Sequence, residues 1–125
     1  MINIRKPSDV CAVWNQEIGS SEEQFIVVLM NEENNMEKKI SVTQGIKEYV
    51  LIEIDKIIEC CCILGATSIA ISHNHPSGNL LPSDDDIDLT NIIIKKCKEA
   101  DINFFDHVIV TSEGNYLSMR NIGMF

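Results

Sequence analysis

Hydrophobic and polar positions follow two different periods along this chain, and the longest stretch with a single period indicates a helix. From residue 49 to residue 64 the apolar positions recur at steps of four and three, which places them on one helix face. They are Val50, Ile54, Ile57, Cys61 and Leu64. The β-propensity of residues 49–52 leaves a second interpretation open, in which they are extended and Asp55 caps a shorter helix. Gly65 is a suitable stop for the helix in both cases.

Short runs of β-branched and apolar residues predict strands elsewhere. The run EEQFIVVLM (22–30), the polar turn NEENN and a second run around 39–43 predict a hairpin. TSIAIS (67–72) predicts a buried strand that leads directly into His73. Near the end of the chain, FFDHVIV and NYLSM flank the turn 112–114 and predict another hairpin.

Two further segments carry helix start signals. In KPSDVCAVWNQ (6–16), Ser8 or Asp9 is a candidate N-cap ahead of apolar residues at helical spacing. Pro82 and Ser83 open a helix that runs to about Ala100. Helices and strands are intermixed, so the predicted class is α/β or α+β with a mixed sheet.

Length and composition indicate a single domain, residues 1–125, with an ordinary hydrophobic core. Hydrophobic residues make up 45% of the 125 positions, and no apolar run reaches the roughly 18 residues of a membrane span. The N-terminal residues lack the features of a signal peptide, so we expect a cytoplasmic protein without membrane association. We interpret the five cysteines as small buried hydrophobic residues in a reducing compartment.

Charge bears on the partners of the protein. Nineteen acidic residues against ten lysines and arginines give a net charge of −9, so direct nucleic-acid binding is disfavoured. The cluster of Lys95, Lys96 and Lys98 more simply complements the negative end of a helix dipole.

The stretch SHNHPSGNLLPSDDD (72–86) has the pattern of a metal site. Side chains alternate along a strand, so His73 and His75 face the same way and can bind one ion. The turn after them allows a helix to begin nearby, with Ser83 as N-cap and Asp86 in the first turn. Two imidazoles and one carboxylate, with a fourth position for water, are a usual ligand set of catalytic zinc. Ser83 and Asp86 also fit an ordinary helix cap, so this pair alone does not define a site.

The same stretch resembles the JAMM motif of the JAB/MPN metalloprotease superfamily, H-x-H-P followed by six residues and S-x-x-D. The HNHPSG sequence, Thr90 four residues after Asp86, and DHVIV at 106–110 are similar to the RadC-like branch. This likeness extends over about residues 21–123. It implies a cytidine-deaminase-like three-layer sandwich, with a central mixed sheet flanked by helices.

The resemblance also implies an activity and roles for residues. Family members of this kind are zinc-dependent hydrolases of peptide or isopeptide bonds, which implies Zn²⁺ at His73, His75 and Asp86. They use an upstream acidic residue as general acid/base, and E-x-F at Glu23 fits it, with Glu22 as the alternative. Ser83 corresponds to the serine that donates a hydrogen bond to the oxyanion.

Several alternatives remain open at this point. The chain has Ile54-Asp55-Lys56 where RadC-like sequences usually have Pro-Arg-Glu, and it lacks their helix-hairpin-helix region, which weakens the expectation of DNA association. A non-catalytic MPN-type scaffold, an accessory role in DNA repair or recombination, and a metal-dependent nuclease are the rival functions. Asp106 and His107 are predicted to be a buried hydrogen-bonded pair rather than partners of the metal ligands. A peptide or protein substrate is expected, a homo-oligomer is compatible with the sequence, and substrate identity is not encoded in the pattern.

Overall fold

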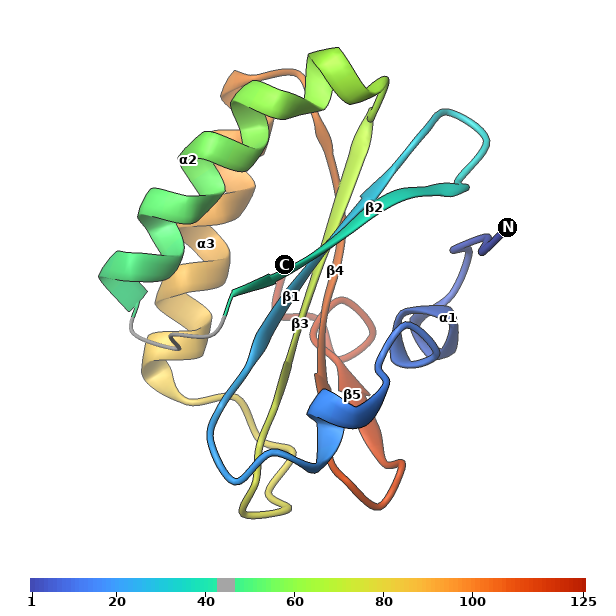
Figure 1. Ribbon diagram of the computed structural model, residues 1–125. Coiled ribbons are helices and arrows are strands. Elements are labelled where there is room, and N and C mark those ends of the chain that lie inside the picture. The colour runs from blue at the N-terminus through green and yellow to red at the C-terminus, as the bar shows by residue number, and fades with distance from the viewer. Residues whose placement is uncertain (43–46) are drawn as a thin grey trace.

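The computed structural model, which describes residues 1–42 and 47–125, has a five-stranded sheet with helices on both faces (Figure 1). The strands are β1 (Phe25–Met30), β2 (Met36–Val42), β3 (Ser68–Asn74), β4 (Asn103–Val110) and β5 (Tyr116–Ser118). The helices are α1 (Pro7–Cys11), α2 (Lys47–Leu64), α3 (Asp84–Glu99) and the short 3-10 helix η1 (Gln16–Gly19). The predicted mixed α/β fold is therefore confirmed.

The sheet is mixed and its strand order is β2-β1-β3-β4-β5. Strand β1 is antiparallel to β2 and to β3, whereas β3 and β4 are parallel and β5 returns antiparallel to β4. Helix α3 lies between β3 and β4 in the sequence and forms the crossover that a parallel pair requires. Both predicted hairpins and the strand before His73 are confirmed, while residue 43 of the second strand prediction lies outside the described residues.

Alternation along the strands divides the core into two layers. Phe25, Val27 and Leu29 of β1 pack with residues of α2 and α3, whereas Ile26 and Val28 pack with the N-terminal segment on the opposite face. Figure 1 shows α2 and α3 together on one side of the sheet and α1 on the other. The molecule therefore has the three layers that the family resemblance implied.

Helix α2 is continuous from Lys47 to Leu64, so the extended alternative for residues 49–52 is wrong. Val50 and Ile54 are both fully buried on its inner face, and this packing outweighs local β-propensity. Gly65 follows with a φ of 70°, as expected for a helix stop. Within the described residues, no helix is long and apolar enough to cross a membrane.

The first helix begins earlier than its capping pattern indicates. Its N-cap is Lys6, rather than Ser8 or Asp9, and Pro7 occupies the first helical position, where a missing N–H costs nothing. Asp9 lies inside the first turn, where its Oδ2 accepts hydrogen bonds from the backbone N–H groups of Arg5 and Lys6, at 2.9 and 3.1 Å.

The cysteine prediction is only partly correct. Cys61 and Cys97 are buried, but Cys60 and Cys62 are exposed on α2 and Cys11 is half-buried; all five are free thiols. Successive residues of a helix point about 100° apart. Three consecutive cysteines therefore cannot all face the core.

Candidate metal centre

The end of β3 brings two imidazole rings together. Nε2 of His73 lies 2.8 Å from Nε2 of His75, which confirms the predicted shared face. His73 is fully buried, whereas His75 is 9% exposed. Solvent therefore reaches this pair from the side of His75.

The first turn of α3 supplies a carboxylate to the same place. Ser83 is the N-cap: its Oγ accepts the backbone N–H of Asp86 at 3.1 Å, and Asp86 Oδ2 accepts the backbone N–H of Ser83 at 2.9 Å. This reciprocal capping holds Asp86 at the helix start. Its Oδ1 lies 3.5 Å from Nε2 of His73, and its Oδ2 lies 3.3 Å from Nε2 of His75. The fold thus brings together the three residues that the sequence proposed as ligands.

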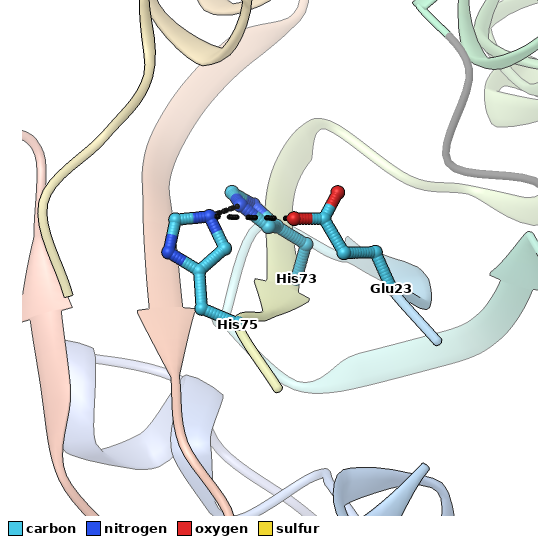
Figure 2. A group of neighbouring side chains, drawn as sticks. All are labelled: Glu23, His73 and His75. Carbon is cyan, nitrogen blue, oxygen red and sulfur yellow. Dashed lines mark hydrogen bonds and ion pairs between the residues drawn. The ribbon is translucent and has the colours of Figure 1, made fainter. Parts of the chain in front are cut away.

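A second carboxylate comes from the segment just before β1. Oε1 of Glu23 lies 3.7 Å from Nε2 of His75, and the Glu23 side chain is 46% exposed. Glu23, His73 and His75 each offer a ligand atom within 4.8 Å of the others. Figure 2 shows the Glu23 carboxylate directed towards the two imidazole rings. Glu22 is not part of this group among the described residues. Of the two candidates Glu22 and Glu23, Glu23 is the one at the site, although it precedes the strand rather than lying on it.

Asn74 fixes the segment that carries Glu23. It lies between the two histidines and points to the other face, as alternation along a strand requires. Its Oδ1 accepts the backbone N–H of Gln24, and its Nδ2 donates to the backbone carbonyl of Glu22 at 3.2 Å. Because these bonds hold the residues on either side of Glu23, they limit where its side chain can reach.

The turn after β3 determines which ring nitrogen of His75 carries the proton. The backbone N–H of Gly78, with a φ of 84°, donates to the carbonyl of His75 at 3.0 Å. Nδ1 of His75 lies 2.5 Å from the carbonyl oxygen of Asn79. A carbonyl only accepts hydrogen bonds, so Nδ1 carries the proton and the neutral ring has its lone pair on Nε2. That lone pair points to the candidate centre.

The donor set fits a divalent cation. Ligand atoms about 2.0–2.2 Å from a tetrahedral zinc ion lie about 3.3 Å from one another. The separations among the three proposed ligands are 2.8 Å between the Nε2 atoms, 3.3 Å from His75 to Asp86 and 3.5 Å from His73 to Asp86, and they bracket that value. Nitrogen and carboxylate donors in one partly exposed cluster are a set that zinc and other transition metals bind. This geometry is consistent with a metal ion and does not by itself identify zinc.

Without a metal, the charged forms of Asp86 and His75 stabilise each other as an ion pair. Burial raises the pKa of Asp86, but hydrogen bonds with His73 and His75 outweigh burial and lower that pKa well below its ordinary range. The hydrogen bond with Asp86 raises the pKa of His75, against the opposing effect of burial. Burial also lowers the pKa of His107 well below its ordinary value, so that ring is neutral.

The far side of the His73 ring contacts residues that the sequence pattern did not assign to the site. Nδ1 of His73 lies 2.6 Å from Nε2 of His107, and Nδ1 of His107 lies 2.6 Å from Oγ1 of Thr90. Phe25 stacks on His73 with ring centroids 4.8 Å apart and an interplanar angle of 13°. His73 is therefore held by contacts on its face and on its edge.

The expected pair of Asp106 and His107 is present but is not the whole role of His107. Both residues are buried, and Asp106 Oδ1 accepts the backbone N–H of His107 at 2.7 Å. The His107 ring also lies against His73, so the contacts support both the predicted pair with Asp106 and a role as partner of a proposed metal ligand. One available signal was Thr90, because residues four apart share a helix face and Thr90 follows Asp86 by four.

A three-layer α/β domain, with two histidines at a strand end opposite a capped aspartate, defines a class of small domains with a candidate metal centre. The chain belongs to the RadC-like JAB domain family, whose model matches residues 4–124. The match begins ahead of residue 21, where the motif resemblance starts, and covers nearly the whole chain.

Similar proteins occur across bacteria under one uninformative name. A UPF0758 protein of Finegoldia magna is 33% identical over 124 residues, which are 98% of this chain and 55% of that protein. UPF0758 proteins of Gloeothece citriformis and Roseiflexus castenholzii are 33% and 30% identical over 122 residues, 97% of this chain and 50% and 52% of their own lengths. The chain thus spans about half the length of the curated relatives it matches, and their names state no activity.

Proposed function

We propose that this chain is a zinc-dependent hydrolase of the metallopeptidase or isopeptidase type. The observation that carries the proposal is the convergence of two Nε2 atoms, 2.8 Å apart, with the Asp86 oxygens at 3.3 and 3.5 Å from them. Membership in the RadC-like JAB domain family supports the same conclusion. Imidazole nitrogen favours zinc over magnesium or calcium, which prefer oxygen ligands.

In this proposal His73, His75 and Asp86 hold the cation, and Glu23 acts as general base. When bound, the cation would polarise a carbonyl group and make water more acidic. Two features of Glu23 support its role: its carboxylate is half-exposed, where substrate has access, and it lies 3.7 Å from His75. A base must sit within reach of the proton that it removes, either directly or through one water.

The protein groups account for the proton movements of amide hydrolysis. Glu23 takes a proton from the attacking water as the water oxygen bonds to the carbonyl carbon. The carbon–nitrogen bond then breaks and Glu23 returns the proton to the amine, which leaves a carboxylic acid and a free amine. Ser83 Oγ accepts the backbone N–H of Asp86, so its own hydroxyl proton is free to donate to the developing oxyanion.

The substrate class in the proposal is a peptide or an isopeptide rather than a nucleic acid. A net charge of −9 disfavours the phosphate backbone, whereas it does not oppose a polypeptide. The five free thiols fit a reducing compartment, and we place the reaction in the cytoplasm on that ground.

Zinc titration and a matched pair of acidic variants test the proposal. The wild-type protein should bind about one zinc ion per chain, and His73→Ala should lose it, because structural and catalytic sites need each ligand. Glu23→Gln should retain zinc and lose turnover on peptide and ubiquitin-like isopeptide substrates. Glu22→Gln is the control, since Glu22 lies outside the group of ligand atoms, and it should match the wild type in both measurements.

Three results would contradict parts of this proposal. Failure of the wild type to take up zinc removes the metal site. Zinc binding with no turnover on any substrate, and with no effect of Glu23→Gln, favours a non-catalytic scaffold. A loss of zinc in Glu23→Gln as large as in Asp86→Asn makes Glu23 a ligand rather than the base.

A further inference from the structure

A buried chain of hydrogen bonds connects two of the proposed metal ligands behind the site. It starts at the carbonyl oxygen of Asp86, 2.7 Å from Oγ1 of Thr90 on the next turn of α3. Thr90 Oγ1 lies 2.6 Å from Nδ1 of His107 on β4, and Nε2 of His107 lies 2.6 Å from Nδ1 of His73. Thr90, His107 and His73 are at most 1% exposed, so water does not compete for these bonds.

The chain has one proton arrangement that prepares His73 for a cation. A neutral imidazole carries one N–H and one lone pair. If His107 keeps its proton on Nδ1, it donates to Thr90, and its Nε2 accepts the Nδ1 proton of His73. The Thr90 hydroxyl then donates to the carbonyl of Asp86, which only accepts. Every contact is satisfied, and the lone pair of His73 lies on Nε2, facing the metal centre.

The reverse arrangement leaves the contact between Thr90 Oγ1 and the carbonyl oxygen of Asp86, 2.7 Å apart, without a proton, and it also closes the site to a cation. Here Thr90 donates to Nδ1 of His107, and Nε2 of His107 donates to Nδ1 of His73. Nε2 of His73 then carries a proton and donates it to the lone pair of His75, 2.8 Å away. The two arrangements differ in the tautomers of both histidines and in the direction of one hydroxyl group. They have the same net charge.

We propose that Thr90 and His107 are positioning residues that set the tautomer of His73 and so leave its lone pair on Nε2, where a cation can bind it. This inference rests on the proposed function of the site as a metal centre. Stacking of Phe25 on the His73 ring, at 13° between planes, holds the ring in place, so Thr90 and His107 act on the position of its proton. Partners behind a metal-bound histidine generally fix its tautomer and orientation.

The test compares Thr90→Val with Thr90→Ser in the full chain. Valine keeps the shape of threonine and removes the hydroxyl, whereas serine keeps the hydroxyl. Zinc affinity, measured by competition with a chromophoric chelator, should fall about 10–100-fold in Thr90→Val and stay near the wild-type value in Thr90→Ser. Thermal unfolding of each variant shows whether it is folded.

Histidine ¹⁵N NMR provides a readout that a purely structural role would not move. In the zinc-loaded wild type, His73 and His107 should both carry their protons on Nδ1. The metal-free wild type should show the same two tautomers, because the Asp86 carbonyl accepts the proton of Thr90 with or without a cation. In metal-free Thr90→Val, His107 should shift towards protonation on Nε2, because the acceptor for its Nδ1 proton is gone.

The outcomes separate this inference from the metal site itself. Wild-type zinc affinity and unchanged tautomers in a folded Thr90→Val overturn the inference, and so does an equal loss of affinity in folded Thr90→Val and Thr90→Ser. Failure of the wild type to bind zinc overturns the proposed function and, with it, the role of the His73 lone pair as a ligand. In that case the positioning role of Thr90 is decided by whether Thr90→Val, and not Thr90→Ser, changes the histidine ¹⁵N spectrum of the metal-free protein.

Discussion

The two carboxylate oxygens of Asp86 contact three neighbouring residues. Oδ2 accepts the backbone N–H of Ser83 and lies 3.3 Å from Nε2 of His75, while Oδ1 lies 3.5 Å from Nε2 of His73. The residue therefore caps a helix, pairs with a histidine and faces the candidate metal centre at once. Its replacement should affect each of these properties by a different amount, which makes them separable.

The ion pair between Asp86 and His75 should give the metal-free protein a stability that depends on pH. The pKa of Asp86 is lowered from 3.8, so its contribution is present above pH 3.8 and is lost as the pH falls towards the folded-state pKa. The pKa of His75 is raised from 6.5, so its contribution is present below pH 6.5 and is lost as the pH rises through the folded-state pKa. The pair should stabilise the fold most between these two values.

Denaturant unfolding of the wild type and Asp86→Asn in the presence of a chelator measures this contribution. Asparagine keeps an oxygen for the helix cap but removes the charge. The difference in unfolding free energy between the two proteins should reach roughly 2 kcal/mol between pH 4 and 6, as for a hydrogen bond to a charged group. This difference should decrease at lower pH and at higher pH. A difference that is the same at every pH would show that the pair does not exist in the metal-free protein.

At the scale of elements, the site depends on where one strand ends and one helix begins. The histidines belong to the end of β3 and Asp86 belongs to the first turn of α3, so the cap at Ser83 fixes the helix start relative to the strand. The same cap satisfies backbone N–H groups that would otherwise lack a partner. Ser83 therefore has a structural role that is independent of any role in catalysis.

Substitution of Ser83 should separate these two roles. Ser83→Ala should lower the unfolding free energy by about 1 kcal/mol, because the N-cap side chain is lost. Ser83→Asp restores a capping oxygen and should recover the stability, but it lacks a hydroxyl to donate to an oxyanion, so turnover should remain low. Recovery of turnover in Ser83→Asp would contradict the oxyanion role while leaving the capping role intact.

At the scale of the whole molecule, the candidate centre joins parts of the chain that are distant in sequence. Glu23 precedes β1, the histidines end β3, and Asp86 opens α3, while His107 lies on β4. The sheet brings these segments together because β1, β3 and β4 are neighbours in it. A cation bound here would hold the folded arrangement and would not find the same ligand set in the unfolded chain.

Zinc should therefore stabilise the fold in a concentration-dependent manner. At free zinc about 100 times the dissociation constant, the unfolding free energy should rise by about 2.7 kcal/mol, visible as a higher Tm by circular dichroism. Excess chelator should reverse the rise, and His73→Ala should show none. An equal rise in His73→Ala would mean that zinc binds elsewhere on the chain.

The sequence by itself determined the local elements and the ligands that lie close along the chain. Periodicity identified α2, the strand before His73 and the terminal hairpin, and the spacing of His73, His75 and Asp86 was enough to predict that they converge. These features depend on local properties, such as side-chain alternation and helix capping. Such properties involve only a few consecutive residues and can be recognised within one short segment. The choice between a helix and an extended segment at residues 49–52 already required tertiary information, because the burial of Val50 and Ile54 decided it.

Only the tertiary structure decided which residues complete the site. The sequence favoured Glu23 and left Glu22 as the alternative, and in the structure the Glu23 side chain is the one that lies with His73 and His75. Contact of His107 with His73 depends on the parallel register of β3 and β4, in which Ile71 pairs with His107. Register across strands far apart in sequence is set by packing of the whole sheet and its helices, and no short stretch of the chain carries that information.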